Sequence, residues 1–319
     1  MKDPILLNKL WKEVEAGRVV ANSSGSLTLF KYTQKTIIED LWNEVNRQAR
    51  GIIFHMDGTI VARPFEKFFN MNEREETKAA NLPWSEGYEI FEKLDGSCGT
   101  GYLVRDNWCL ATPGSMESDQ AIEGTKILNE YSEINSAGRY QIQYLPTDCT
   151  PVFEIIYPEN RIVVDYEGAR ELVLLAIFEH NGVEWHPRRV DQIAQMCGFR
   201  RPKEYRMDLR EATFEENSEG YVCRFDNGLR VKVKSPTYVR IHRLLDAMSP
   251  KGVIALIRGR EYGVTVKQLP RAIACDFDDI RALVQGMYDK IFTDAHANLN
   301  ILRSTFHANA SRKVLAQWI

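Results

Sequence analysis

Tyr88-Glu89-Ile90-Phe91-Glu92-Lys93-Leu94-Asp95-Gly96 is an alternating segment that ends in a turn. The alternation predicts a β-strand, and the Asp-Gly pair predicts a turn directly after it. We therefore expect the amine of Lys93 at the end of a strand, facing a loop. A lysine becomes a nucleophile where burial or neighbouring cations favour its neutral form. An ordinary surface lysine before a hairpin turn is the simpler alternative, so Lys93 needs support from the rest of the chain.

Composition places the chain among globular proteins. Its 319 residues are 44% hydrophobic and 27% charged, and the formal net charge is −3. There is no apolar run of about eighteen residues, and the N-terminus does not resemble a signal peptide, so we expect no membrane association. A contact with a polyanion would depend on local basic clusters such as Arg188-Arg189 or Lys232/Lys234. Such clusters are also common on ordinary solvated surfaces.

The cysteines indicate a reducing compartment. The six are Cys98, Cys109, Cys149, Cys197, Cys223 and Cys275. No Cys-x-x-Cys pair occurs, which argues against a zinc site or a disulfide framework. We expect reduced thiols and a cytoplasmic protein, located in the host cytoplasm if a phage encodes it.

Short strand-like runs dominate the chain from about residue 19 to 235. Runs at 26–30, 51–55, 59–62, 88–94, 152–157, 172–178, 220–225 and 229–234 predict strands. The turn Asp226-Asn227-Gly228 predicts that the last two form a hairpin. Helices are expected at 4–16, 117–135 and 188–197. This mixture predicts an α+β fold with antiparallel sheets and flanking helices.

The pattern changes after Tyr238. Apolar residues at helical spacing predict helices near 251–258 and across 280–292. We place a boundary near residue 243, with a larger domain over 1–243 and a small all-helical domain over 244–319. The acidic run 276–279 could hold a metal, but the N-terminal cap of a helix is the favoured interpretation.

Charged residues in other predicted strands support a role for Lys93 beyond that of an ordinary surface lysine. Lys232 and Lys234 point to the same face of a strand, because strand side chains repeat every two residues. Two lysines on one face repel each other unless an anion lies between them. Exposed lysines on an edge strand are the alternative. Glu154 lies within another strand, and Glu219-Gly220 begins a third.

Together these segments resemble an ordered series of motifs. Lys93-Leu94-Asp95-Gly96, Phe153-Glu154, Glu219-Gly220-Tyr221-Val222 and Lys232-Val233-Lys234 are similar to the motifs of covalent nucleotidyltransferases, which include ATP-dependent ligases and mRNA capping enzymes. Arg50-Gly51-Ile52-Ile53-Phe54, the segment 62–73, Asn160–Val164 and Tyr238-Val239-x-x-His242 resemble, more narrowly, the phage-type RNA ligase 1 family. The resemblance runs from about residue 20 to 243. It implies a nucleotidyltransferase (ATP-grasp-like ligase) fold.

The resemblance implies a covalent mechanism centred on Lys93. In that family the motif lysine attacks the α-phosphorus of ATP and carries AMP as a phosphoramidate. AMP then passes to an RNA 5′-phosphate, and a 3′-hydroxyl displaces it to form a phosphodiester. Lys232 and Lys234 would stabilise charge on the α-phosphate and favour the neutral amine of Lys93.

The remaining candidates would bind the nucleotide. Glu154 and Arg50 would hold the AMP ribose or neighbouring groups, while Asp95, Gly96 and Gly220 belong to motifs that shape its surroundings. Lys67 would meet the β- and γ-phosphates. Phe69 is a stacking or packing candidate, whereas Phe68 more often belongs to a core. Glu219 is the metal candidate, for Mg²⁺ or alternatively Mn²⁺.

One position departs from the family pattern. A basic residue normally precedes the Gly-Ser that corresponds to Gly114-Ser115, and this chain has Pro113 there. Lys126 and Arg105 are the substitutes that the sequence suggests. The helical C-terminal region resembles the family only loosely, so a preference for tRNA is the weakest implication.

Three classes of function follow. The first is an ATP-dependent RNA ligase that joins 5′-phosphate and 3′-hydroxyl ends of single-stranded RNA or tRNA, acts as a monomer and serves in RNA repair. The second is another lysyl-nucleotide enzyme, a DNA ligase or a capping guanylyltransferase. Those usually append a β-barrel, which the helical spacing after Tyr238 disfavours. The third is a non-catalytic protein that binds RNA ends.

Overall fold

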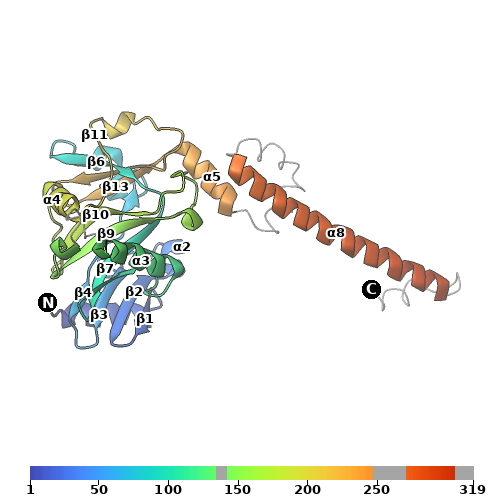
Figure 1. The fold of residues 1–319 in the computed structure, drawn as a ribbon, viewed down its shortest axis with the longest axis horizontal. Coiled ribbons are helices and arrows are strands. Elements are labelled where there is room, and N and C mark those ends of the chain that lie inside the picture. The colour runs from blue at the N-terminus through green and yellow to red at the C-terminus, as the bar shows by residue number, and fades with distance from the viewer. Residues whose placement is uncertain (134–141, 247–270, 306–319) are drawn as a thin grey trace. The chain divides into compact units, whose positions relative to one another are not determined.

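The computed structural model describes residues 1–133, 142–246 and 271–305. The chain divides into two compact units, Met1–Tyr238 and Val239–Ile319, and each is described by itself. Three sheets build the first unit, and Figure 1 shows strands β1–β4 at one end, β7, β9 and β10 in the middle, and β6, β11 and β13 at the other end.

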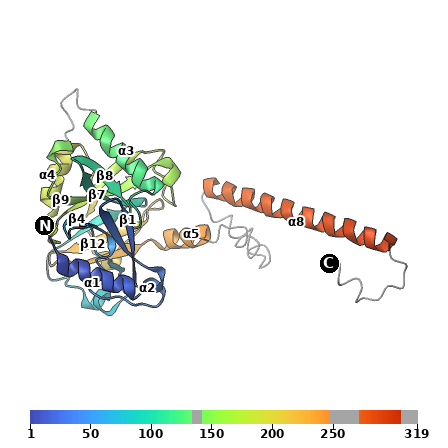
Figure 2. The same ribbon diagram turned by 90° about the horizontal axis from the view of Figure 1, so that it is seen from below.

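The N-terminal sheet has the order β1-β2-β3-β4. Its strands are β1 (Val19–Ser24), β2 (Leu27–Tyr32), β3 (Arg50–His55) and β4 (Ile60–Ala62). Helix α1 (Pro4–Glu15) covers one face, as Figure 2 shows, and buries Leu10 against Phe30 and Phe54. Leu29 and Ile53 point to the opposite face, where they pack against β7 and β8. The two-residue repeat of a strand therefore gives this sheet two buried faces.

The central sheet has the order β10-β9-β7-β8. Its strands are β7 (Ser97–Val104), β8 (Asn107–Ala111), β9 (Cys149–Ile156) and β10 (Glu171–Glu179). Helices α3 (Asp119–Glu133) and α4 (Pro187–Cys197) pack on it and enclose an apolar core around Phe153. Gly198 ends α4 with a φ of 78°, a left-handed conformation that favours glycine.

The third sheet has the order β11-β6-β12-β13-β5. Its strands are β5 (Phe69–Asn70), β6 (Tyr88–Lys93), β11 (Glu204–Tyr205), β12 (Gly220–Phe225) and β13 (Arg230–Lys234). The predicted hairpin is confirmed, since β12 and β13 are antiparallel and joined by the turn at 226–229. Only the pairing of β13 with β5 is parallel among the described strands.

Short elements complete the first unit. They are α2 (Gln34–Ile38) and the 3₁₀ helices Glu75–Thr77, Ala79–Asn81, Ile142–Tyr144, Pro158–Asn160 and Leu209–Glu211. The predicted α+β class with antiparallel sheets is thus confirmed. Asp95-Gly96 does not close a hairpin, however, because β6 and β7 belong to different sheets and the pair forms the crossing between them.

The C-terminal part that the structure describes is helical. Helix α5 (Pro236–Asp246) contains both the division between the units and the predicted boundary at residue 243, and the assignment of two domains remains a prediction. Helix α8 (Arg271–Thr305) is longer than the predicted 280–292. The acidic run 276–279 lies inside α8, so its assignment as an N-terminal cap is wrong. The predicted helix at 251–258 lies outside the described residues.

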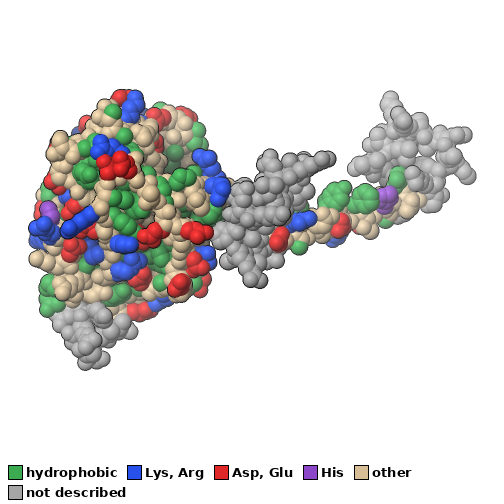
Figure 3. Space-filling model, turned by 90° about the horizontal axis from the view of Figure 1, so that it is seen from above, with side chains coloured by type: hydrophobic (Ala, Val, Ile, Leu, Met, Phe, Trp, Pro, Cys, Tyr) green, Lys and Arg blue, Asp and Glu red, His purple; other side chains and the backbone are tan. Residues whose placement is uncertain are grey.

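The charges on the surface of the first unit and the hydropathy of the described helices agree with the composition. Figure 3 shows basic and acidic side chains interspersed over the visible face of the first unit. Within the described ranges, none of the helices combines the length and apolar character needed to cross a bilayer. The five cysteines of the first unit are free thiols.

The core between α1 and the N-terminal sheet yields a prediction about stability. Phe54 is 1% exposed and meets the ring of Phe30 edge-on at 6.1 Å. Phe54→Ala should lower the free energy of unfolding by about 3–5 kcal/mol, because it leaves a cavity. Met56, two residues along the chain, is 76% exposed, so Met56→Ala should change that free energy by at most about 0.5 kcal/mol. Urea unfolding of both variants measures this, and equal midpoints would contradict the assigned core.

Candidate active site

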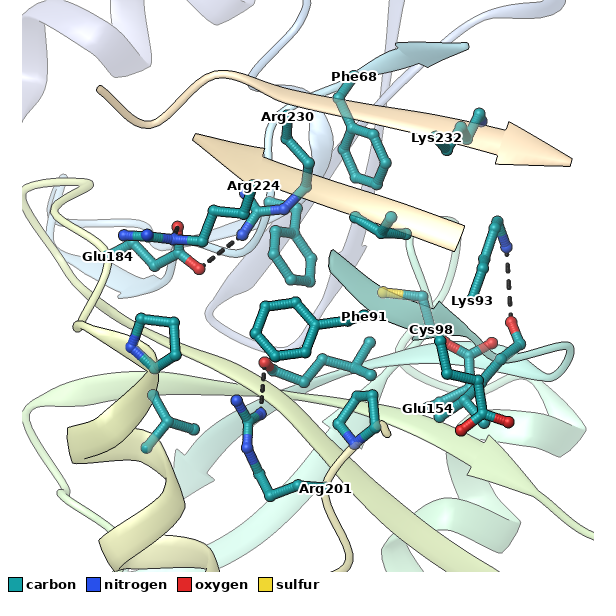
Figure 4. A pocket seen from close by; sticks show the side chains of 18 of the residues that line it. Phe68, Phe91, Lys93, Cys98, Glu154, Glu184, Arg201, Arg224, Arg230 and Lys232 are labelled. Atoms are coloured by element: carbon teal, nitrogen blue, oxygen red, sulfur yellow. Dashed lines mark hydrogen bonds and ion pairs between the residues drawn. The ribbon is translucent and has the colours of Figure 1, made fainter. Parts of the chain in front are cut away.

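A cavity lies between the third sheet and the central sheet. Its lining includes side chains from β6, β12 and β13 on one side and from β7, β9 and β10 on the other. Figure 4 shows Lys93 and Glu154 at one end of this cavity and Glu184, Arg224 and Arg230 at the other. Seven basic side chains line it: Arg50, Lys93, Arg201, Arg224, Arg230, Lys232 and Lys234. The acidic ones are Glu92, Glu154 and Glu184. The excess of cations suits an anionic ligand.

Strand register brings the three predicted lysines together. Gly220 on β12 lies opposite Lys93 on β6 and also opposite Lys234 on β13. Lys232 is two residues from Lys234, so both side chains leave the same face of the sheet. β13 lies between β12 and β5, which excludes the alternative that these lysines decorate an edge strand. The sequence prediction that Lys93, Lys232 and Lys234 share one site agrees with this arrangement.

Glu219 joins two of these lysines. Lys93 Nζ lies 2.6 Å from Glu219 Oε2, and Lys234 Nζ lies 2.9 Å from Glu219 Oε1. The Glu219 side chain is only 3% exposed. A carboxylate buried this deeply requires charged partners, because its desolvation is costly. Each oxygen of Glu219 therefore holds one amine at the cavity.

The backbone conformation at position 220 and the close packing of β13 require glycine there. Its φ is 139°, and a Cβ there would lie 2.0 Å from the carbonyl oxygen of Val233. Any side chain would push β13 away from β12. Gly220 thus keeps Lys234 in register with Lys93.

Burial and like charges weaken the proton affinity of Lys232. Desolvation, followed by the charges of Lys67, Lys93 and Arg50, lowers the pKa of Lys232 to about 7. Burial also lowers the pKa of Lys67. Arg50 Nη1 is buried and has no hydrogen-bond partner among the described residues. The protein carboxylates around these cations are too few to balance their charge. An incoming polyphosphate would balance it.

Glu154 lies half-buried on the opposite wall. Its Oε1 accepts a hydrogen bond of 2.9 Å from the backbone amide of Gly96. Burial raises the pKa of Glu154 to about 7, although the nearby charge of Lys93 opposes the shift. A Cβ on Gly96 would lie 2.6 Å from the carbonyl oxygen of Ile155, so only glycine allows this close approach.

Asp95 acts within the protein rather than in the cavity. Its carboxylate accepts hydrogen bonds from the backbone amides of Val163 and Val164 and from the hydroxyl of Tyr238, at 2.8, 2.9 and 2.7 Å. The Asp95 amide donates to the Tyr166 hydroxyl at 2.7 Å. The residue does not line the cavity that holds Lys93. The Asp95 side chain therefore fixes the loop that follows Lys93.

Of the two neighbouring phenylalanines, Phe69 adopts the packing alternative that the sequence left open, and Phe68 differs from the sequence expectation. Phe69 is 3% exposed and packs edge-on against Trp42 at 5.6 Å, with Lys67 Nζ 4.9 Å from its ring centre. Phe68, which the sequence favoured as core, lines the cavity. Arg50 and Lys232 lie 5.2 and 5.6 Å from the Phe68 ring. Lys67 and Phe69 themselves line an adjoining pocket that shares Phe68 and Arg230 with the cavity.

Sequence reasoning missed the far end of the cavity. Glu184 pairs with Arg224 at 3.1 Å and with Arg230 at 2.6 Å. Arg224 lies opposite Arg230 in the register of β12 and β13. Arg230 is two residues before Lys232 on β13, so its side chain leaves the same face of the sheet as Lys232 and Lys234. Phe91, on β6 two residues before Lys93, also lines the cavity. The period of two along β6, β12 and β13 was the signal that could have identified these residues.

The donors present suit a divalent cation that also binds phosphate. No group of three or more His, Cys, Asp or Glu side chains within the described ranges could hold a metal alone. Glu219 and Glu154 lie close enough that the charge of Glu219 contributes to the raised pKa of Glu154. Mg²⁺ is usually held by one or two carboxylates together with substrate phosphates and water. The residues of this cavity therefore fit such an ion.

Comparisons with known proteins agree with this site. A family model described as RNA ligase matches residues 48–238. A putative RNA ligase of Thermovibrio ammonificans is 29% identical over 251 residues, which cover 75% of this chain and 64% of that protein. RNA ligase 1 of bacteriophage TS2126 is 26% identical over 236 residues, covering 65% and 54%. The chain thus spans between about half and two thirds of the length of these relatives.

Solved structures share the fold. An archaeal ATP-dependent RNA ligase has a TM-score of 0.54 at 12% identity, covering 98% of this chain and 85% of that one. A putative ATP-dependent DNA ligase from Aquifex aeolicus has a TM-score of 0.52 at 12% identity, covering 91% and 75%. The matched family region takes in more than half of the 319 residues and every wall of the cavity, and on this ground the chain belongs to the RNA ligase family.

Proposed function

We propose that this chain is an ATP-dependent RNA ligase that works through a lysyl-AMP intermediate on Lys93. Lys93 and Lys234, held by the carboxylate of Glu219, together with Lys232 on the same strand face as Lys234, carry this proposal. An amine at the end of a strand, surrounded by cations and facing a cavity, suits attack on a nucleotide phosphate. Membership of the RNA ligase family supports RNA as the substrate.

The reaction has three balanced steps. Lys93 Nζ loses a proton and attacks the α-phosphorus of ATP, forming an N–P bond as pyrophosphate leaves. An oxygen of the RNA 5′-phosphate then attacks the same phosphorus, which breaks the N–P bond as the Lys93 amine takes up a proton, and places AMP on the RNA end. A 3′-hydroxyl finally loses its proton to solvent and attacks the 5′-phosphorus, which breaks the bond to AMP, forms the phosphodiester and releases AMP. Glu219, 2.6 Å from Lys93, is in place to accept the first proton.

The remaining residues would bind the nucleotide and stabilise the charge on its phosphates. Lys232 and Lys234 would meet the α-phosphate, where charge increases in each transition state. Arg50, with its unpartnered Nη1, and the half-buried Glu154 would hold the phosphate and the ribose hydroxyls. Lys67, in the adjoining pocket, would meet the β- and γ-phosphates. Glu219 and Glu154 would hold Mg²⁺ or Mn²⁺, which supplies charge neutralisation at the phosphates.

The proposal extends to partners. RNA with 5′-phosphate and 3′-hydroxyl ends, either single-stranded or a broken tRNA, is the expected substrate, and RNA repair is the expected role. The free thiols suit a reducing cytoplasm, and the protein is proposed to act as a monomer.

The central experiment is incubation with ATP labelled at the α-phosphate. The wild-type chain should form a covalent protein–AMP adduct that is stable in alkali and labile in acid, as a P–N bond is, and Lys93→Ala should abolish it, because the nucleophile is removed. Lys126→Ala is the matched control, since that lysine is 63% exposed and pairs only with Glu123 among the described residues. Labelling by GTP alone would instead indicate capping chemistry, and no labelling with either nucleotide would favour an RNA-end-binding protein.

A second prediction concerns the transition-state charge. Lys232→Ala and Lys234→Ala should each lower the rate of adenylation by about 10²–10³-fold, as loss of one stabilising group does. Single-turnover labelling measures both rates. Normal adenylation in the two variants would refute the roles assigned to these lysines.

A third prediction concerns pH. The pKa of Glu154 is raised from 4.5 to about 7, so the folded state binds more protons than the unfolded state between these values. This contribution to stability is present below pH 4.5 and is lost as pH rises through about 7. Glu154→Gln should therefore gain stability relative to the wild type between pH 5 and pH 8, by at most about 3 kcal/mol.

Urea unfolding at both pH values measures this difference. Glu15→Gln, an exposed carboxylate at the end of α1, is the control and should show no such change. A difference for Glu154→Gln that is the same at pH 5 and pH 8 would show that this carboxyl does not titrate as described.

A further inference from the structure

Tyr238 contacts two parts of the active site at once. It lies in the first turn of α5, directly after β13, and is only 4% exposed. Its hydroxyl donates a hydrogen bond of 2.7 Å to Asp95 Oδ1, in the loop after Lys93. The amine of Lys234 lies over the Tyr238 ring, 4.9 Å from the ring centre. One buried side chain therefore contacts both the loop that follows the nucleophile and a lysine of β13.

These contacts complete a network that begins and ends at Lys93. Lys93 Nζ lies 2.6 Å from one oxygen of Glu219, and Lys234 Nζ lies 2.9 Å from the other. This connection is the Glu219 link. A second connection, the Tyr238 link, runs from Lys234 through Tyr238 to Asp95. Because Asp95 follows Lys93 by two residues, both links hold Lys93 in place relative to Lys234.

The Tyr238 link ends on a carboxylate that is itself fixed. Asp95 is 3% exposed, and its Oδ2 accepts hydrogen bonds from the backbone amides of Val163 and Val164 at 2.8 and 2.9 Å. A buried carboxylate is costly unless donors satisfy both oxygens, and Tyr238 supplies the donor for Oδ1. Burial, followed by the charges of Glu219 and Asp95, raises the pKa of Tyr238. The hydroxyl therefore keeps its proton and remains a donor.

The first step of the proposed reaction breaks the Glu219 link. Formation of the N–P bond takes a proton from the Lys93 amine, and the nitrogen of the phosphoramidate carries no positive charge. The attraction that holds Lys93 and Glu219 at 2.6 Å is then lost. The Tyr238 link contains no atom of the Lys93 side chain, so it persists through this step. It can keep the loop after Lys93 beside Lys234 while AMP is attached.

We propose that Tyr238 is a positioning residue, which holds the loop after Lys93 in register with Lys234 while Lys93 carries AMP. Tyr238 does not line the cavity and acts through Asp95 and Lys234. The step that depends on it most is the transfer of AMP to the RNA 5′-phosphate, because the Glu219 link is absent there. This inference rests on the proposed ligase function, since a covalent intermediate on Lys93 is what makes the two steps differ.

Two single-turnover reactions of the full chain test the proposal. The first is labelling of the protein by saturating ATP that is labelled at the α-phosphate. The second is transfer of AMP from the isolated protein–AMP adduct to a 5′-phosphorylated RNA without ATP. Tyr238→Phe keeps the ring beneath Lys234 and removes only the hydroxyl. It should slow the transfer by about tenfold and the labelling by at most about threefold, on the scale of a hydrogen bond to a charged group.

Tyr221→Phe is the matched control. Tyr221 is also 4% exposed, and its hydroxyl donates a hydrogen bond of 2.7 Å to the carbonyl oxygen of Thr213. Its ring packs in the apolar cluster of the third sheet and does not line the cavity. The same atom is thus removed from a comparable environment outside the network around Lys93. Both reactions should keep the wild-type rate in this variant, and thermal unfolding shows whether each variant folds.

Asp95→Asn tests whether the hydroxyl acts through Asp95. This variant alters the acceptor of the same hydrogen bond, so it should also slow the transfer more than the labelling, and it replaces Tyr238→Phe if that variant does not fold. The double variant should transfer AMP no more slowly than the slower single variant, because both substitutions disrupt one contact. Multiplication of the two effects would show that Tyr238 does not act through Asp95 and would overturn the proposal.

The outcomes separate this inference from the ligase function. A wild-type chain that forms no adduct on Lys93 would overturn both. If the wild type forms the adduct, a Tyr238→Phe variant whose transfer is slowed no more than its labelling would overturn the role of Tyr238 and leave the ligase function standing. The same unequal slowing in Tyr221→Phe would also overturn that role, because it would follow from the loss of any buried tyrosine hydroxyl.

Discussion

The buried carboxylate of Glu219, shared by Lys93 and Lys234, is the interaction on which the site depends. Three lysines on the two strands that flank β12 would repel one another, and burial of their amines raises that cost. Glu219 offsets part of it at 2.6 and 2.9 Å, and Lys232 is left with a lowered pKa. The remaining imbalance is what a nucleotide phosphate can satisfy. The charge arrangement is therefore costly without substrate and favourable with it.

The pairing of the strands in the third sheet keeps these charged side chains in register. Gly220 lies opposite both Lys93 and Lys234, and its φ of 139° permits the close approach of β13. On the other side of the crossing at Asp95-Gly96, the carboxylate of Asp95 binds two backbone amides and Tyr238. Because the loop connects two different sheets, its position sets how Glu154 on β9 faces the lysines.

Local patterns predicted the elements and the charged residues, but not the contacts between sheets. The strand period of two identified Lys232 and Lys234 as neighbours, and the Asp-Asn-Gly turn identified the β12–β13 hairpin. The Asp95-Gly96 crossing could not be told from a hairpin turn, since partner strands are a tertiary property. For the same reason Phe68 was expected in a core although it lines the cavity, because a strand pattern does not say which of its two faces meets a cavity. Nor did local spacing give the full length of α8.

A ligand responds to the potential at a place, not to the position in sequence that supplies it. Lys93 and Lys232 lie far apart along the chain, yet the pairing of β12 with β6 and with β13 brings both to one cavity. Charge placement in such a site is therefore a property of the sheet register, and a motif read along one segment captures only part of it.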